Sequence, residues 1–397
     1  MVAASAACAT KSTARLPAAG RLWHDEMAGP AAGGVRAMPI CEYFSRDYAS
    51  ARRRFQSAAA RAGASLTSHV LPGHAGPSGE ALAIDVARLG NPDAQSALLV
   101  ISGTHGIEGY AGSGCQVGLL EDRFHEALPG SACLLLLHAL NPHGFAWLRR
   151  VNEDGIDLNR NFIDFSQPLP SSAAYEALHD WLVPADWDGE ARRAADAALM
   201  AFGQTHGMPA LQTAVSGGQY TRPGGLFYGG TRESWSALTL ARILTEVLPG
   251  TVRRLGVLDL HTGLGPAGYG EPILDGSRPA DRERALRWYG ADVKDLAAGE
   301  SISARLVGTM ARGIERIRPQ LELTFIGLEF GTRPTMEVLT ALRADHWLHA
   351  RAGADTAVRA GIQQQMRDAF FSASPSWQAA VYGRTADLVL RAFRGLG

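Results

Sequence analysis

Short, continuous apolar runs alternate with longer segments of helical periodicity through most of this chain. The runs at 82–90, 97–103 and 132–140 contain few polar residues, as in ALLVISG at 97–103. Residues 110–124, between the last two runs, suit a crossover helix. A strand, a helix and another strand, with the later strands fully apolar, predict a buried and largely parallel sheet.

Further along the chain the same two patterns continue. The runs at 254–263 and 323–332 are typical of central strands, and residues 43–62 form an amphipathic helix that opens the folded domain. No internal repeat or Pro-, Gly- and Ser-rich linker divides the chain after residue 40. We therefore expect one α/β domain with a central, mixed but mostly parallel sheet and helices on both faces. Other helices are expected at 172–183, 189–203, 233–247, 281–290, 335–349, 354–371 and 376–393.

Residues 1–37 differ from the rest. They are rich in Ala, Gly, Ser and Pro and show no sustained apolar periodicity. The sequence predicts a disordered N-terminal extension at 1–37 and a folded domain at 38–397.

The composition of the chain limits the kinds of molecule that the protein is expected to bind. The formal net charge of −1 and the 46% hydrophobic content are those of an ordinary globular protein and indicate neither nucleic acid nor an anionic membrane as a partner. No apolar run has the length of a membrane span, and no compact apolar signal sequence opens the chain. Cysteine is scattered without a C-x-x-C pair, so a cytoplasmic protein is expected, and the oligomeric state stays open. The cysteines are Cys8, Cys41, Cys115 and Cys133.

The first candidate for chemistry is the sequence SGTHGIEGYAG. His105 and Glu108 follow the strand at 97–103 in a Gly-rich turn, and ligands of open α/β sheets bind beyond the carboxyl ends of strands. Imidazole and carboxylate are good ligands of first-row metals. The alternative is a capped turn with an exposed His–Glu pair.

A second histidine stands at a similar point. His261, in VLDLHTGLG, closes the predicted strand at 254–263. Together with His105 and Glu108 it provides the three-ligand, open site that catalytic zinc uses. The alternative for His261 is a histidine at the edge of the core, hydrogen-bonded to a neighbouring carbonyl.

The third cluster is IGLEFGT, where Glu329 lies in an otherwise apolar run. A carboxylate there is costly unless it is paired or used, so a general base beside a metal is favoured over a structural salt bridge. Glu322 and Glu337 are nearby, but neither stands at the end of the strand.

The longest motif is NPHGFAWLRRVNEDGIDLNRNF at 141–162. With the His-x-x-Glu turn before it and the later His and Glu after it, this segment resembles the signature of the zinc carboxypeptidase superfamily. The aspartoacylase and succinylglutamate desuccinylase branch shares G-x-H-G-x-E and D-L-N-R, so the superfamily is defined better than the branch. The four ordered motifs extend over residues 80–340.

The resemblance implies a role for each matching residue. It implies one Zn²⁺ per chain on His105, Glu108 and His261, with Glu329 as the catalytic glutamate. Arg150 matches the arginine that polarises the scissile carbonyl, and Asp157 the carboxylate that orients a ligand histidine. Asn159 and Arg160 match the pair that binds the terminal carboxylate of the substrate. The alternative for both arginines is a surface salt bridge.

The resemblance implies hydrolysis of an amide bond next to a free carboxylate, in a small peptide or an N-acyl amino acid. The sequence does not choose between a carboxypeptidase and a deacylase of the aspartoacylase type. A catalytically silent carboxylate-binding protein on the same fold is the rival, which retention of Glu329 disfavours. The stretch GGQYTRPGGLFYGG at 217–230 departs from the family pattern and is expected to shape the pocket.

Overall fold

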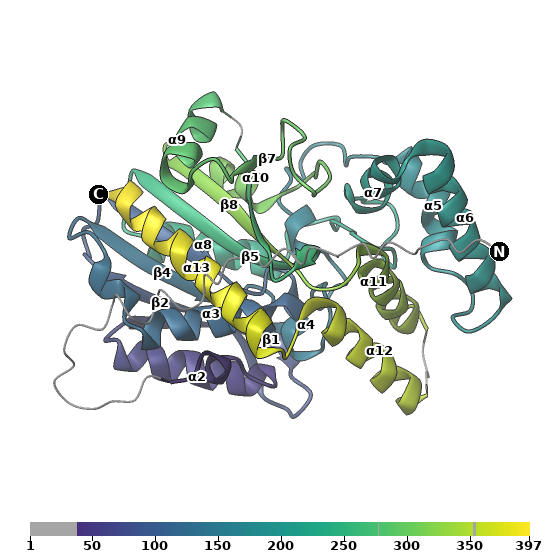
Figure 1. Cartoon of the computed structure of the whole chain (residues 1–397), viewed down its shortest axis with the longest axis horizontal. Helices are drawn as coiled ribbons and strands as arrows, with labels where there is room; N and C mark the ends of the chain where they lie inside the picture. The colour runs from purple at the N-terminus through teal and green to yellow at the C-terminus, as the bar shows by residue number, and fades with distance from the viewer. Residues whose placement is uncertain (1–37, 277, 352–354) are drawn as a thin grey trace, which may run out of the picture. The chain divides into compact units, whose positions relative to one another are not determined.

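The five apolar runs become strands of one eight-stranded sheet (Figure 1). The computed structural model describes residues 38–276, 278–351 and 355–397. The predicted strands are β2 (Ala81–Gly90), β3 (Ser96–Ile101), β4 (Ala132–His138), β5 (Arg254–Ala267) and β8 (Glu322–Gly331). Three more strands were not predicted, β1 (Ser65–Ala75), β6 (Gly270–Leu274) and β7 (Lys294–Asp295).

The sheet is mixed and mostly parallel, as predicted. Its strand order is β1-β2-β4-β3-β5-β8-β6-β7. The central strands β4, β3, β5 and β8 run parallel, whereas β1 with β2, β2 with β4, and β6 with β8 are antiparallel. The helix α3 (Gly109–Glu121) is the expected crossover between β3 and β4. The carboxyl ends of β3, β5 and β8 therefore meet at one edge of the sheet.

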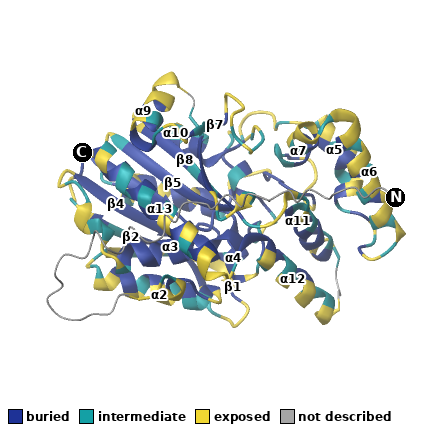
Figure 2. Ribbon diagram, viewed as in Figure 1, coloured by how far each residue is buried: buried dark blue, intermediate teal, exposed yellow. Residues whose placement is uncertain are grey.

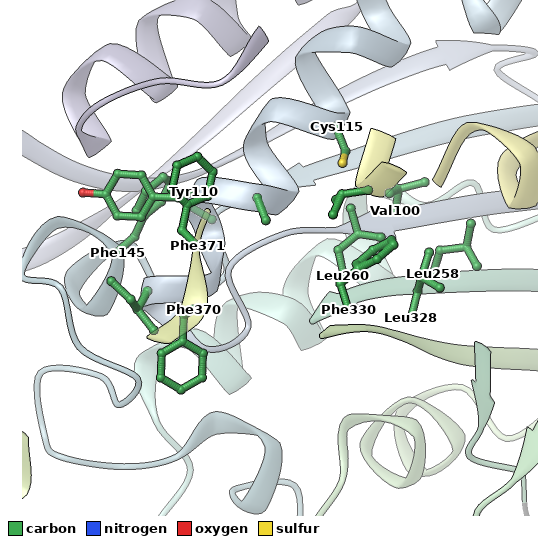
Figure 3. Close-up of a cluster of buried hydrophobic side chains, with 14 of the residues drawn as sticks. Val100, Tyr110, Cys115, Phe145, Leu258, Leu260, Leu328, Phe330, Phe370 and Phe371 are labelled. Carbon is green, nitrogen blue, oxygen red and sulfur yellow. The ribbon is translucent and has the colours of Figure 1, made fainter. Parts of the chain in front are cut away.

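Helices cover both faces of the sheet, which confirms that part of the prediction. Alternate residues of a strand face opposite sides, so Leu98 and Val100 join a core with α2, α3 and α13, while Leu99 and Ile101 join a second core with α8 and α10. Figure 3 shows part of the first core, where Val100 and Leu260 of the sheet lie beside Cys115 of α3. Figure 2 shows the strands buried between these layers.

Each of the expected helices is present. They are α2 (Tyr48–Arg61), α5 (Ala173–Leu182), α6 (Glu190–His206), α8 (Trp235–Arg242), α9 (Pro279–Tyr289), α11 (Thr335–His349), α12 (Thr356–Phe370) and α13 (Pro375–Leu396). The helices α4 (Pro142–Ala146), α7 (Met208–Ser216) and α10 (Met310–Ile317) were not predicted. Figure 1 shows α5, α6, α7, α11 and α12 gathered beyond one end of the sheet.

Residues 39–397 form one compact unit, which agrees with a single folded domain. The predicted disordered extension at 1–37 lies outside the described residues. Among the helices that are described, none has the length and apolar character needed to cross a membrane.

Candidate metal centre and substrate cavity

The His-x-x-Glu turn opens α3 directly after β3. His105 precedes a short 3-10 turn, Gly106–Glu108, and both His105 and Glu108 are buried. The amide of Gly106 donates to the carbonyl of Arg150 at 3.0 Å, and the amide of Ile107 donates to the carbonyl of Arg149 at 2.8 Å. A side chain at Gly106 would collide with the backbone of Gly144 at 2.1 Å, so glycine is required for this close contact. The turn is thereby fastened to the 141–162 motif.

The structure brings His105, Glu108 and His261 together. The Nδ1 atoms of the two histidines lie 3.2 Å apart, and Glu108 places Oε1 3.0 Å from Nδ1 of His105 and Oε2 2.9 Å from Nδ1 of His261. Tetrahedral zinc with bonds of about 2.0–2.1 Å separates its ligand atoms by about 3.3 Å. These three donors therefore have the spacing of one coordination shell.

A carboxylate lies behind each imidazole. Nε2 of His105 is 3.1 Å from Oδ1 of Asp157, and Nε2 of His261 is 2.7 Å from Oδ2 of Asp259. For His261 we assign the ring proton to Nε2, because Asp259 accepts it. A proton on Nε2 of His105 would be accepted by Asp157 in the same way, and both Nδ1 lone pairs would then face Glu108. Three electron-rich donors directed at one point fit a cation.

The electrostatics of the cluster favour positive charge. Although burial alone would lower the pKa of His261, the carboxylates of Asp259 and Glu108 raise it well above its usual value. Burial would raise the pKa of Glu108, but the two histidines hold it below the usual range. Buried carboxylates at this density require cations among them, and a metal ion fits that requirement.

Asp259 was not singled out from the sequence. It is fully buried on β5 and also accepts a hydrogen bond from Oγ1 of Thr104 at 2.7 Å. Its signal was present in VLDLHTG: residues two apart on a strand face the same side, so an aspartate two positions before His261 can reach that histidine.

Glu329 lies beside His261 on the neighbouring strand. The two residues are paired in the register of β5 and β8, and both line the same cavity. Oε1 of Glu329 accepts from the amide of Leu264 at 3.1 Å. Burial, followed by the negative charge of Glu108, raises the pKa of Glu329 to about 8. No arginine or lysine among the described residues forms an ion pair with Glu329, so the carboxylate is not held in a structural salt bridge.

Arg150 reaches into the metal centre. Its Nε donates to Asp157 at 2.9 Å and its Nη1 to Glu108 at 3.1 Å, while Nη2 lies 2.7 Å from Nε2 of His105. Arginine nitrogens only donate, so Nη2 pairs here with an unprotonated Nε2. If Nε2 instead carries a proton that Asp157 accepts, Nη2 loses this acceptor and can donate to another group in the cavity, which Arg150 lines.

Arg160 and Asn159 form the other polar end of the cavity. Arg160 is 2% exposed, and its guanidinium donates to the carbonyls of Asn159 and Ser216 at 2.6–3.2 Å. Within the described part of the chain no carboxylate lies within 4 Å of it. Burial lowers the pKa of Arg160. Oδ1 of Asn159 accepts from the amide of Met310 at 2.9 Å, which leaves its NH₂ group without a protein acceptor among the described residues.

One cavity of about 340 Å³ is lined by His105, His261, Glu329, Arg150, Asn159 and Arg160. Most of the other residues that line the cavity are apolar. The unpredicted helix α7 and the helix α11 supply Met208, Leu211, Val215, Met336, Leu339 and Leu342. The stretch at 217–230 contributes Phe227. Among the cavity-lining residues that the structure describes there is no tyrosine.

Two other histidines near the motif lie outside this cavity. His138 stacks on Phe55 with ring centroids 4.6 Å apart and has Nε2 2.9 Å from the hydroxyl of Ser113. His143 packs against His74 and Trp147. Burial lowers the pKa of both histidines to about 4. Both pack in the protein rather than join the ligand cluster.

The family described as "Protein of unknown function (DUF2817)" matches residues 44–384. No curated protein sequence matches the chain. The solved structures that resemble it include carboxypeptidase A from Helicoverpa armigera, with 11% identity, a TM-score of 0.41, and coverage of 87% of this chain and 74% of that one.

Two further similar structures come from bacteria. One is a metallo-carboxypeptidase from Pseudomonas aeruginosa, with 15% identity, a TM-score of 0.33, and coverage of 85% of this chain and 69% of that one. The other is succinylglutamate desuccinylase from Chromobacterium violaceum, with 18% identity, a TM-score of 0.35, and coverage of 79% and 72%. These proteins represent both groups named by the motif resemblance. At such identities and TM-scores none of them informs the chemistry of this site.

Proposed function

This chain belongs to the DUF2817 family of proteins of unknown function, and we propose that it is a zinc-dependent hydrolase of amide bonds next to a free carboxylate. One observation carries the proposal. The two histidines of a His–Glu–His cluster share one cavity with Glu329 and with a buried arginine that has no carboxylate within 4 Å among the described residues.

The ligands would be His105, Glu108 and His261, with one zinc per chain. When bound, zinc supplies a Lewis acid that polarises a carbonyl and lowers the pKa of water. Glu329 accepts a proton from the attacking water and passes it to the leaving amine nitrogen. Arg150 turns its donor edge to the carbonyl oxygen, which gains negative charge in the transition state.

The substrate's carboxylate would bind at Asn159 and Arg160. A guanidinium presents parallel N–H groups that match a carboxylate, and the cost of burying Arg160 falls when an anion joins it. The apolar walls from α7 and α11 favour an alkyl or aryl group near that carboxylate. The C-terminal amide of a peptide and the amide of an N-acyl amino acid both meet this description.

A panel of substrates tests the proposal. The full chain would be assayed on short peptides and N-acyl amino acids, each with a free carboxylate and with the matching C-terminal amide. We expect about one zinc per chain by elemental analysis, turnover of carboxylated members, loss of activity with a chelator and recovery with zinc. Activity of metal-free protein would overturn the metal role. Carboxylate binding without any turnover would identify a silent binding protein instead.

A further inference from the structure

Phe227 has a backbone conformation that its side chain disfavours. Its φ of 54° lies in the left-handed region, which bulky residues rarely adopt. Phe227 is 8% exposed and lines the cavity. A strained residue persists only where its surroundings fix it, and such residues concentrate at functional sites.

Hydrogen bonds hold the backbone on both sides of Phe227. The amide of Gln219 donates to the carbonyl of Phe227 at 3.2 Å, and the amide of Gly229 donates to the carbonyl of Gln219 at 2.8 Å. The carbonyl of Tyr228 accepts from the amide of Asp157 at 2.8 Å. The segment is therefore fastened to the same aspartate that contacts His105 and Arg150.

The ring of Phe227 contacts both arginines of the cavity. The guanidinium carbon of Arg150 lies over the ring at 5.1 Å from its centroid, and that of Arg160 lies over it at 5.5 Å. The negative face of an aromatic ring attracts a cation, and this attraction strengthens where water is excluded. The two arginines carry like charges, and Arg150 is one of the groups that lower the pKa of Arg160, after burial.

We infer that Phe227 is a positioning residue, which fixes the two guanidinium groups so that one substrate can present its carbonyl to Arg150 and its carboxylate to Arg160. The inference rests on the proposed function. This role accounts for the left-handed backbone conformation of Phe227. The hydrogen-bonded backbone places the ring against both arginines, and that contact requires the disfavoured φ.

The test compares three variants of the full chain. Phe227→Leu keeps the backbone strain and most of the bulk but removes the aromatic ring. Phe227→Tyr keeps the ring. Phe393→Leu makes the same change to a buried phenylalanine of α13 that does not line the cavity and over which no guanidinium lies in the described structure.

We expect Phe227→Leu to lower kcat/KM for the carboxylated substrate by about 10-fold or more, through both a higher KM and a lower kcat. Phe227→Tyr should stay within about threefold of the intact protein, and so should Phe393→Leu. Zinc content and thermal unfolding should show that all three variants are folded. Equal losses in Phe227→Leu and Phe393→Leu, or a loss that tyrosine does not restore, would show that Phe227 acts only through packing.

A binding measurement separates this inference from the proposed function. Phenylacetate, which joins an aryl group to a carboxylate, would be titrated calorimetrically into the intact chain and into Phe227→Leu. We expect about 10-fold weaker binding to the variant. Unchanged binding and unchanged kinetics in Phe227→Leu overturn the role of Phe227 alone. An intact chain that neither binds phenylacetate nor hydrolyses any panel member overturns both proposals.

Discussion

The two polar ends of the cavity satisfy their buried charges in different ways. At the metal centre each imidazole has a carboxylate behind it, and Glu108 contacts both rings. At the other end, Arg160 donates to backbone carbonyls and lies over an aromatic ring, and no carboxylate of the described residues is within 4 Å of it. The proposed function accounts for this difference if the first end binds a metal cation and the second binds a carboxylate.

Another buried arginine near the site is satisfied in a different way from Arg160. Arg149 adjoins Arg150 in the chain, and its Nε donates to Asp345 of α11 at 3.1 Å. The protein therefore can provide a carboxylate for a buried guanidinium where one is needed for the fold. Arg160 has none within 4 Å in the described structure, as expected of a group whose partner arrives with the substrate.

The largest expected effect comes from replacing Glu329, the candidate general base beside the proposed metal site. We expect Glu329→Gln to lower kcat by about 10²–10⁴ while zinc content stays near one per chain, because the amide cannot accept the proton of water. Glu322→Gln is the matched control, since it makes the same change on β8 at an exposed position and should leave kcat unchanged. Steady-state kinetics and elemental analysis measure both. Near-normal turnover in Glu329→Gln would assign the base elsewhere.

Removing the guanidinium tests the anion end. Arg160→Ala should cost about 2–5 kcal/mol in kcat/KM for a substrate with a free carboxylate and much less for its amidated counterpart. The ratio of the two kcat/KM values is the measurement. If both substrates lose equally, Arg160 serves the fold and not carboxylate recognition.

Arg149→Ala is the control that sharpens this contrast. It leaves Asp345 buried without its guanidinium, so we expect about 3 kcal/mol of lost stability, seen as a lower midpoint of denaturant unfolding. The preference for the carboxylated over the amidated substrate should remain. A changed preference in this variant would show that Arg149 and Arg160 do not have separate roles.

The central sheet could be predicted from the sequence because its strands are buried on both faces. Continuous apolar runs such as 97–103 mark them directly. The strand β1, in contrast, is mostly exposed and carries a mixed sequence, SLTSHVLPGHA, which has no such signal. The helix α7 has nine residues, begins Met-Pro and lies close behind α6, so its short pattern was not distinguished.

The candidate metal ligands could be grouped from the sequence because each stands beside a recognisable strand end, and the structure brings them together. The contact between Asp259 and His261 could also have been predicted, because residues two apart on a strand face the same side. Phe227 carried none: its φ and its contacts with two arginines depend on how residues 217–230 fold back onto Asp157. Long-range contacts of this kind are not encoded in local periodicity.

The smallest expected effect concerns Asp259, and it tests whether the metal end depends on the carboxylates behind its ligands. Asp259→Asn keeps an oxygen that can accept from Nε2 of His261 at the present 2.7 Å, but it removes the negative charge that strengthens the imidazole as a ligand. Zinc affinity should fall by about 10–100-fold, as measured by competition with a chromophoric chelator.

Asp85→Asn is the control, because Asp85 is an equally buried strand aspartate whose partner is Arg52. That variant should lose stability but keep its zinc affinity. Unchanged affinity in Asp259→Asn would mean that Asp259 only anchors Thr104 and His261 within the fold. Zinc affinity would then depend on the three direct ligands alone.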